Sequence, residues 1–351
     1  MRCYDGGRRL AAGRTVRSGT HPANPFHPKP RRSDRWVEFV MHGTSISANS
    51  TIDVIIATRD RHELLLRTID SILGQEYSGT VRITVVYDRS PERPDLVRTS
   101  DTRPIRVMSN QRTPGLPGSR NTGLLAATAP LIAFCDDDDL WRKDKLQRQV
   151  QSLREQNATG CVSGIEVHFG DSRITRIPEV AYVTEDDLAG SRLTGAHPST
   201  FLFQREHLLS EVGLVDEELP YGYGEDYDLL LRAAQRGRIA VLSEVTVDVL
   251  WHPGGSYFSQ RWQAMADGVG YLMDKHPSIR ANRRGAAWME GQRAFALAAL
   301  GNQHTAARQM AATSLSHSLL EPRAYLALAM TLNLIKPGTI LRALNARGRG
   351  I

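Results

Sequence analysis

Short apolar runs alternate with helix-like segments through the first half of the chain, and this alternation constrains the fold most. Ile52–Ala57 and Val81–Tyr87 are apolar runs of strand length, and between them Arg61–Leu73 places its apolar residues at helical spacing. Two further runs, Ile105–Met108 and Leu131–Cys135, continue the pattern. Strands that alternate with helices form mainly parallel sheets with right-handed crossovers. The sequence therefore predicts an α/β fold with a Rossmann-like, mainly parallel sheet flanked by helices.

Polar residues follow three of these predicted strands at the points where the strands end. They are Thr58–Asp60, Asp88 and the run Asp136–Asp139. Open parallel sheets bind ligands at the carboxyl ends of their strands. We therefore expect these side chains to face one crevice.

The four consecutive aspartates at 136–139 are the sharpest chemical signal. Like charges this close repel one another, and some would stay protonated without a cation. Asp139 could instead cap the helix that we expect from about Leu140 to Gln156, but a cap accounts for only part of the run. Carboxylate oxygens suit Mg²⁺ or Mn²⁺, which bridge carboxylates to phosphates. The run predicts a metal and phosphate site.

A second acidic group, Glu225 and Asp226, opens a predicted helix that reaches Gln235 and stops at Gly237. Acids in a first helical turn often only complement the helix dipole. The preceding loop, Pro220–Gly224, is rich in glycine and tyrosine, which favours close approach of a ligand and stacking on a sugar. A carboxylate at this position can act as a general base toward an acceptor hydroxyl.

Two single residues are weaker candidates. His252 follows the strand predicted at Ile239–Val249, where ligation of metal or diphosphate and a structural role are both open. Arg120 lies near a predicted helix start, where it could donate charge-assisted hydrogen bonds to phosphate.

The second half of the chain ends in Ala-rich helices. Strands are expected at Cys161–Phe169 and Ser199–Phe203, and three helical segments follow. They are Ala286–Leu300, Ala306–Leu315 and Ala324–Leu334. The pattern predicts a domain at residues 51–280 and a helical C-terminal extension at 281–351. The last stretch, 337–351, is amphipathic and basic, which fits a solvated terminal helix or a contact with a membrane surface.

The basic charge of the chain is concentrated at its start. Residues 1–50 hold nine Lys and Arg against three Asp and Glu, which accounts for the whole net charge of +6. The remainder is formally neutral, which argues against a nucleic-acid-binding face. Residues 1–50 lack apolar periodicity and are predicted to be disordered, and translation from Met41 would remove most of them. The three cysteines have no metal-ligand spacing. Cys135 and Cys161 lie in apolar strand-like runs and are expected to be buried thiols rather than a disulfide, which fits a reducing cytoplasm.

Five motifs resemble those of family 2 glycosyltransferases with the GT-A fold. Val54–Arg61 resembles their opening strand and loop, and Val85–Ser90 resembles their second strand end. Gly118–Gly123 resembles their Arg-Asn-Gly helix, and Phe134–Trp141 resembles their DXD metal motif. Glu225–Leu229 resembles their acidic acceptor-side motif. The motifs occur in the family's order over residues 51–260.

The resemblance implies a role for each matching residue. The donor nucleotide sugar would be held by Thr58, Asp60, Asp88, Arg120, Asp136 and Asp137. The metal would be held by Asp138, Asp136 and His252, with Asp138 as the direct ligand. Asp226 would be the catalytic base, with Glu225 beside it on the acceptor side. Tyr87 stands where the family commonly has an acid, so a nucleotide other than UDP is plausible.

The predicted function is an inverting, metal-dependent transfer of a sugar from a nucleotide-diphosphate sugar to an acceptor hydroxyl. It would serve cell-surface polysaccharide, glycolipid or glycoconjugate synthesis, with Mg²⁺ or Mn²⁺ as cofactor and a glycan, lipid-linked or small-molecule acceptor. No apolar stretch approaches membrane-spanning length, so membrane contact would be peripheral, at the inner face of the cell membrane.

Two alternatives remain. One is a non-catalytic sugar-binding or scaffold protein on the same fold. The other is a nucleotidyltransferase, which is disfavoured because Ala57–Arg61 contains no glycine of the phosphate-binding loop that such enzymes carry after their first strand.

Overall fold

The computed structural model describes residues 46–251 and 261–345. Residues 43–351 form one compact unit. Most of the tail predicted to be disordered, and His252, lie outside the described residues.

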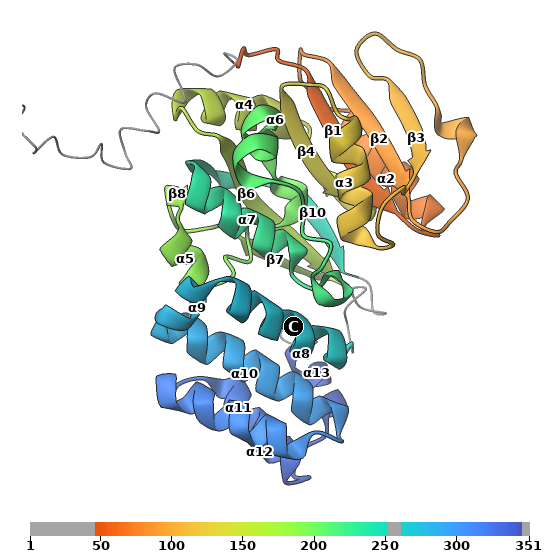
Figure 1. The fold of residues 1–351 in the computed structure, drawn as a ribbon. Helices are drawn as coiled ribbons and strands as arrows, with labels where there is room; N and C mark the ends of the chain where they lie inside the picture. Colours follow the sequence, from red (N-terminus) through yellow and green to blue (C-terminus); the bar gives the residue numbers. More distant parts are fainter. Residues whose placement is uncertain (1–45, 252–260, 346–351) are drawn as a thin grey trace, which may run out of the picture. The chain divides into compact units, whose positions relative to one another are not determined.

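The elements follow the predicted alternation of strands and helices (Figure 1). The strands are β1 (Ile52–Thr58), β2 (Val81–Tyr87), β3 (Ile105–Ser109), β4 (Leu131–Asp136), β5 (Asp139–Trp141), β6 (Gly160–Phe169), β7 (Ser172–Arg176), β8 (Tyr182–Val183), β9 (Leu202–Gln204) and β10 (Ile239–Trp251). The helices of the first part are α2 (His62–Leu73), α3 (Leu116–Ala126), α4 (Lys145–Glu155), α5 (Glu185–Gly190), α6 (Arg205–His207) and α7 (Glu225–Arg236). Those of the last part are α8 (Trp262–Lys275), α9 (Pro277–Ala281), α10 (Arg283–Leu300), α11 (His304–His317), α12 (Pro322–Thr331) and α13 (Pro337–Asn345).

In the described residues the strands form one ten-stranded sheet, in which the path β3-β2-β1-β4-β9-β6-β10-β5 joins eight of them. The pairs β1–β2, β1–β4, β2–β3 and β6–β10 are parallel. The short strand β9 runs antiparallel to both of its neighbours, β4 and β6. As a result β1, β2, β3, β4, β6 and β10 all run in the same direction, and their carboxyl ends lie at one edge of the sheet.

Both faces of the sheet are buried, as the apolar strands predict. Successive residues of β1 point to opposite faces, so Val54 and Ile56 enter one core cluster and Ile55 enters the other. Helices α2 and α4 cover the first face, with Leu65 and Leu146 in its core. Helices α3 and α7 cover the second face. The predicted α/β fold with flanking helices is confirmed.

Two local predictions are wrong. The helix expected from about Leu140 begins only at Lys145, because Asp139–Trp141 forms β5 and pairs antiparallel with β10. Asp139 therefore caps no helix. The strand expected at Ser199–Phe203 is a 3₁₀ turn at Pro198–Thr200, and pairing begins only in β9. Each of these strands pairs with a segment that is distant in sequence, so the local residue pattern could not predict where the strand lies.

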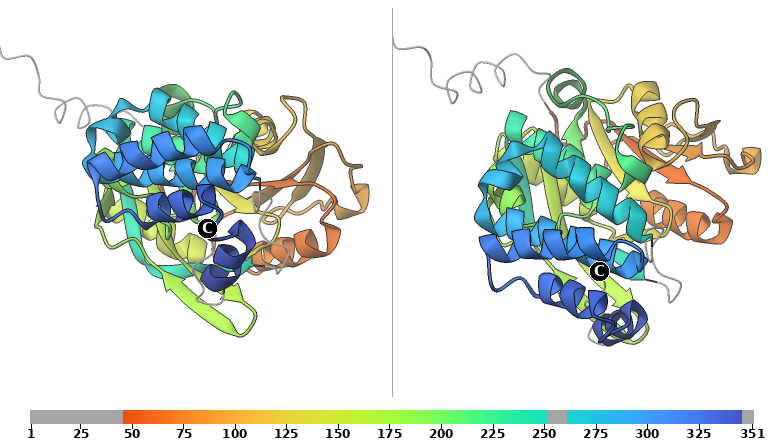
Figure 2. Two further views of the ribbon diagram at one scale, coloured as in Figure 1. Left: turned by 90° about the horizontal axis from the view of Figure 1, so that it is seen from below. Right: turned by 60° about the horizontal axis from the view of Figure 1, so that its bottom comes forward.

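The C-terminal helices stack on one another beside the sheet domain (Figures 1 and 2). Helix α10 packs against α8, α11 and α12. Small residues make these approaches close, since Ala294, Ala307, Ala311 and Ala327 are all fully buried. No helix among the described residues is both long enough and apolar enough to cross a membrane. The boundary predicted between residues 280 and 281 stays a prediction.

Candidate active site

A cavity of about 1360 Å³ opens at the carboxyl edge of the sheet. Every described residue that the sequence analysis assigned to the site lines it. These are Thr58, Asp60, Asp88, Arg120, Asp136, Asp137, Asp138, Glu225 and Asp226. They come from the ends of β1, β2 and β4 and from the N-terminal halves of α3 and α7. The fold thus brings distant segments to one place, while their individual roles stay predictions.

The end of β1 is tied to the aspartate run. The Thr58 hydroxyl donates to Asp137 Oδ2 at 2.7 Å. Arg61 Nη1 donates to Asp137 Oδ1 at 3.2 Å and to Asp138 Oδ2 at 2.8 Å. Asp60, which lies between Thr58 and Arg61 in the sequence, has a left-handed backbone conformation with φ 55°. Arg61 therefore balances part of the negative charge at the end of β4.

Asp88 fixes the loop that leads into α3. Its Oδ1 accepts the Gly115 N–H at 2.9 Å and the Asn110 amide at 3.0 Å. Burial by itself raises the pKa of Asp88, but these hydrogen bonds and Arg89 lower it below the usual aspartate value. Gly115 has φ 123°, which only glycine adopts readily, so the turn into α3 depends on it. Asp88 thus both accepts a backbone hydrogen bond from Gly115 and faces the cavity.

The aspartate run is crowded, as its charges predict. Burial, then the neighbouring aspartates, raise the pKa of Asp138 to about 7, against the opposing effect of Arg61. Burial and the same neighbours raise the pKa of Asp139 well above its usual value, although Ser199 donates to its Oδ2 at 2.5 Å. The pKa of Asp137 is also raised by burial. A divalent cation would relieve this repulsion.

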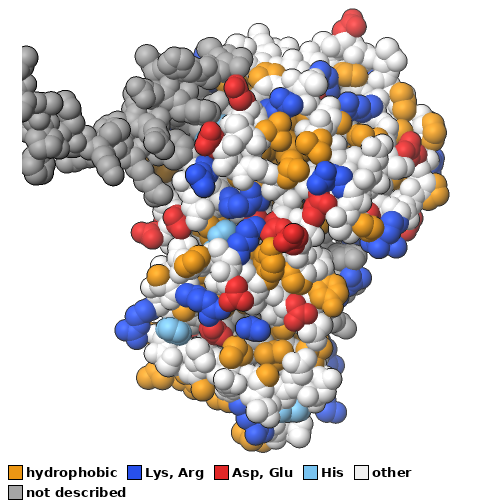
Figure 3. Space-filling view, viewed as in Figure 1, with side chains coloured by type: hydrophobic (Ala, Val, Ile, Leu, Met, Phe, Trp, Pro, Cys, Tyr) orange, Lys and Arg blue, Asp and Glu red, His pale blue; other side chains and the backbone are white. Residues whose placement is uncertain are grey.

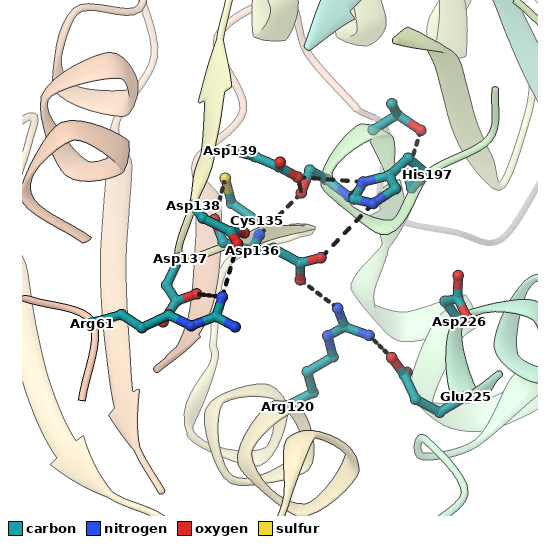
Figure 4. Close-up of polar contacts among 12 residues, drawn as sticks. Arg61, Arg120, Cys135, Asp136, Asp137, Asp138, Asp139, His197, Glu225 and Asp226 are labelled. Carbon is teal, nitrogen blue, oxygen red and sulfur yellow. Dashed lines mark hydrogen bonds and ion pairs between the residues drawn. The ribbon is translucent and has the colours of Figure 1, made fainter. Parts of the chain in front are cut away.

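One group at the run has the geometry of a metal site. Oxygen atoms of Asp136 and Asp139 and a ring nitrogen of His197 lie within 4.8 Å of one another. His197 Nδ1 is 3.3 Å from Asp139 Oδ2, and its Nε2 is 4.0 Å from Asp136 Oδ2 (Figure 4). Asp138, the predicted direct ligand, instead contacts Arg61. The donor set of carboxylates and one imidazole fits Mn²⁺ or Mg²⁺.

Arg120 links the two acidic groups of the site. Its Nη2 donates to Asp136 Oδ1 at 2.6 Å, and its Nη1 contacts Glu225 Oε1 (Figure 4). The guanidinium is buried, with 4% of its side chain exposed. Two carboxylates more than offset the cost of this burial, so the pKa of Arg120 is raised and its charge is permanent. The end of β4 and the start of α7 are thereby held together by one cation.

Glu225 and Asp226 begin α7 directly after Gly224, whose φ of 80° makes the sharp entry possible. Arg192 Nη2 donates to both oxygens of Asp226 at 2.9 Å. Burial alone would raise the pKa of Asp226, but Arg192, and less strongly Arg120 and His197, hold it below the usual value. Asp226 is therefore ionised at neutral pH.

Glu225 has the opposite environment. Burial raises its pKa to about 7, helped by Asp226 and opposed by Arg120. Its Oε2 is buried and has no hydrogen-bond partner among the described residues. A group of this kind can hold or accept a proton near neutral pH.

Sequence reasoning missed three residues that the site depends on. Arg61, Arg192 and His197 contact the acids. Of these, only Arg61 lies within one of the five motifs, and the sequence analysis gave it no role. Arg192 and His197 belong to the segment between α5 and β9, which carries no periodic pattern.

Residues 53–210 match the family described as Glycosyl transferase family 2. The succinoglycan biosynthesis protein ExoO of Rhizobium meliloti is 29% identical over 226 residues, covering 60% of this chain and 63% of that protein. The UDP-Glc:alpha-D-GlcNAc-diphosphoundecaprenol beta-1,3-glucosyltransferase WfgD of Escherichia coli is 25% identical, covering 55% of this chain and 73% of that protein. The match to ExoO therefore spans less than two thirds of that relative.

Two solved structures share the architecture. S. aureus TarS residues 1–349, in complex with UDP-GlcNAc, has a TM-score of 0.56 at 17% identity and covers 81% of this chain and 89% of that one. The mannosyltransferase PcManGT from Pyrobaculum calidifontis, in complex with GDP-Man and Mn²⁺, has a TM-score of 0.52 at 18% identity, with 90% of each chain covered. At these identities the likeness concerns the fold.

Proposed function

We propose that this chain transfers a sugar from a nucleotide-diphosphate sugar to an acceptor hydroxyl. The match of residues 53–210 to glycosyl transferase family 2 supports this proposal. The product would belong to a cell-surface polysaccharide, glycolipid or glycoconjugate; the relative ExoO is named for succinoglycan biosynthesis. The observation that carries the proposal is the cavity in which the strand-end acids and the acids of α7 face each other.

The proposed reaction is an in-line displacement at the anomeric carbon, with inversion. Asp226 is ionised and faces the cavity, so it is our candidate to remove the proton of the acceptor hydroxyl. Arg192 holds both of its oxygens and would keep the carboxylate oriented. Glu225, with one free buried oxygen, would accept a hydrogen bond from the acceptor.

On the donor side, Thr58, Asp60 and Asp88 would contact the base and ribose, and Arg120, Asp136 and Asp137 the diphosphate and sugar. Asp136 is our main candidate for the metal, together with Asp138, Asp139 or His197. When bound, Mg²⁺ or Mn²⁺ would neutralise the charge of the nucleoside diphosphate leaving group. His252 stays a further candidate ligand.

The second candidate function is a sugar-binding protein without activity. Decay of an enzyme should first remove the acids, yet all of those predicted are present in one cavity. We favour the enzyme for that reason.

The experiment is hydrolysis of a panel of UDP-, GDP-, dTDP- and ADP-sugars by the full chain, with and without Mn²⁺. We expect one nucleotide sugar to be hydrolysed slowly in the absence of acceptor, and EDTA to stop the reaction. If a sugar nucleotide stabilised the protein thermally but none was turned over, with or without candidate acceptors, the binding protein would be the better interpretation.

The C-terminal helices suggest a peripheral membrane contact. Leu332 and Leu334 at the turn between α12 and α13 are 60% and 72% exposed, next to Lys336. Figure 3 shows apolar side chains at the surface over the C-terminal helices. Apolar residues flanked by basic ones favour anionic interfaces. We expect the chain to co-sediment with anionic vesicles, and the double variant Leu332→Ser/Leu334→Ser to lose this binding.

The matched control is Leu319→Ser/Leu320→Ser. That pair is 71% and 90% exposed, so it is at least as exposed as Leu332 and Leu334, and it lies just before the other end of α12. Equal binding by all three proteins, or binding to zwitterionic vesicles alone, would contradict the assignment of this turn.

A further inference from the structure

The cavity is larger than one substrate requires. Its volume of about 1360 Å³ exceeds the roughly 300–1,000 Å³ of ordinary ligand pockets. The acids and the loops after β1, β2 and β4 line one side of it. The C-terminal helices line another side, although they lie outside the part of the chain that matches the family. There is room for an acceptor beside the donor.

The helical side has its own chemistry. Trp288, Gln292 and Phe295 follow one another at helical spacing on α10 and all line the cavity. Trp288 packs edge to face on Tyr227, the residue after Asp226, with ring centroids 6.2 Å apart. Gln292 Nε2 donates to the Tyr223 hydroxyl at 3.3 Å. An indole face and an amide next to the candidate base are suited to holding a sugar ring.

The charges on this side are all positive. Among the described residues that line the cavity, those of β7, β10, α8, α10 and α12 include Arg176 and Arg323 and no Asp or Glu. Arg323 is oriented by Glu321, which accepts from its Nη1 at 2.8 Å. The cavity lining therefore carries its acids at the strand ends, whereas the charged residues of these other elements are basic.

Of these two arginines, Arg323 pairs with Glu321, whereas Arg176 has no carboxylate partner among the described residues. Its guanidinium lies 5.2 Å from the centroid of the Trp251 ring, and no carboxylate in residues 46–251 or 261–345 forms an ion pair with it. Residues 252–260 contain no Asp or Glu either. A half-buried guanidinium without a carboxylate, stacked on an aromatic ring in a cavity, is a site for an anion.

We infer that Arg176, Trp251, Trp288, Gln292, Phe295 and Arg323 form an acceptor wall, and that the acceptor is a sugar carrying an anionic group. This inference rests on the proposed function. Trp288 and Gln292 hold the acceptor ring near Asp226, and Arg176 pairs with the phosphate or carboxylate of the acceptor. The acceptor is thus selected by residues that the catalytic motifs do not include.

The test measures binding to the full chain with Mn²⁺ and the nucleoside diphosphate of whichever sugar nucleotide the wild type hydrolyses. The probes are glucose, glucose 1-phosphate and glucuronate. We expect both anionic probes to bind at least about tenfold more tightly than glucose, since hydrogen bonds to charged groups are the stronger ones. Tighter binding of only one probe identifies the anion as phosphate or carboxylate.

Two variants locate the effect. Arg176→Ala should weaken glucose 1-phosphate about tenfold, and Trp288→Ala should weaken all three probes, while the affinity for nucleoside diphosphate stays within about twofold. Trp288→Phe keeps an aromatic ring, so it should bind the three probes nearly as tightly as the wild type. This comparison shows whether Trp288→Ala acts by losing a contact with the probe or by disturbing the fold. Arg284→Ala is the matched control, because Arg284 is exposed on α10 and does not line the cavity.

Failure of the inference and failure of the proposed function are distinct results. If the wild type hydrolyses a nucleotide sugar but Arg176→Ala binds glucose 1-phosphate as the wild type does, the acceptor wall is wrong. The same holds if Arg176→Ala loses nucleoside diphosphate instead, because Arg176 then serves the donor. If no nucleotide sugar is turned over, with or without candidate acceptors, the proposed function itself fails.

Discussion

The two adjacent acids of α7 differ because each has a different arginine. Arg192 contacts both oxygens of Asp226, whereas Arg120 shares its charge between Glu225 and Asp136. Asp226 is thereby kept ionised, and Glu225 is left with a pKa of about 7. Two neighbouring carboxylates with separated pKa values can divide proton removal and hydrogen bonding between them.

Replacing Asp226 by Asn should remove the base with little change in shape. We expect transfer to fall by about 10²–10⁴-fold, the usual contribution of positioned acid–base catalysis, while the affinity for the nucleotide sugar stays within about twofold. Initial rates and donor titrations measure the two effects. Asp186→Asn, an exposed acid of α5, is the control. Near-normal turnover by Asp226→Asn would falsify the assignment of the base.

The ion pair of Asp226 with Arg192 predicts a pH effect. Arg192 lowers the pKa of Asp226, and burial alone would raise it. The base must be ionised to act, so Arg192→Ala should move the acidic limb of the rate profile to higher pH. Arg192→Lys keeps the charge and should move it less. Profiles of kcat against pH from 5 to 9 test this, and an unchanged acidic limb in Arg192→Ala would exclude the proposed coupling.

At the scale of elements, the site depends on how closely α3 lies on the sheet. Gly123 sits where a Cβ atom would be 2.5 Å from Ile55 Cγ2 and 3.3 Å from Val86 Cγ2. Both neighbours are fully buried. This close approach holds α3 against the sheet, and α3 carries Arg120 between the acids.

Gly123→Ala should therefore destabilise the protein although alanine favours helices. The gain in helix propensity is about 1 kcal/mol, while overpacking a core costs typically about 1–3 kcal/mol. We expect the clash to outweigh the gain, because Ile55 is buried in the core at 1% exposure, and the Tm to fall by several degrees. Gly338→Ala on α13 meets no atom within 4 Å and should leave the Tm unchanged or raise it. Equal Tm values for wild type and Gly123→Ala would contradict the packing.

For the whole molecule, the crowded aspartates connect folding to pH and to metal. The pKa of Asp138 is raised to about 7 in the folded protein, against about 3.9 in an unfolded chain. Between these values the folded protein binds more protons than the unfolded one, so its free energy of unfolding falls as pH rises. The acids that make the candidate metal site thus weaken the metal-free fold at neutral pH.

We expect the Tm of the metal-free protein to decrease from about pH 4.5 to 7 in part through these groups, and Mn²⁺ to reverse the decrease. A ligand at one hundred times its Kd stabilises by about 2.7 kcal/mol. Thermal unfolding across this pH range, with EDTA or with Mn²⁺, measures both effects. Asp138→Asn should flatten the pH dependence. No response to Mn²⁺ at neutral pH, where the acids are most ionised, would speak against the metal site.

The sequence by itself determined the α/β class and the sheet with its flanking helices. It also determined that the strand-end acids would lie in one crevice. The position of the strand-end acids can be predicted because apolar runs define the strands, and because the carboxyl ends of parallel strands lie at one edge of the sheet. Thr58, Asp88 and Asp136 were all predicted to face that crevice, and they line the cavity.

Only the tertiary structure decided what each charge is paired with. Arg192 and His197 lie on a segment with no periodic pattern, and β5 forms because β10 is beside it. Helix α10, which carries Trp288, packs against α8 and lines the cavity, and no local pattern encodes this packing. Ion pairs and cavities depend on distances between segments far apart in the chain, whereas periodicity records only which face of an element is buried.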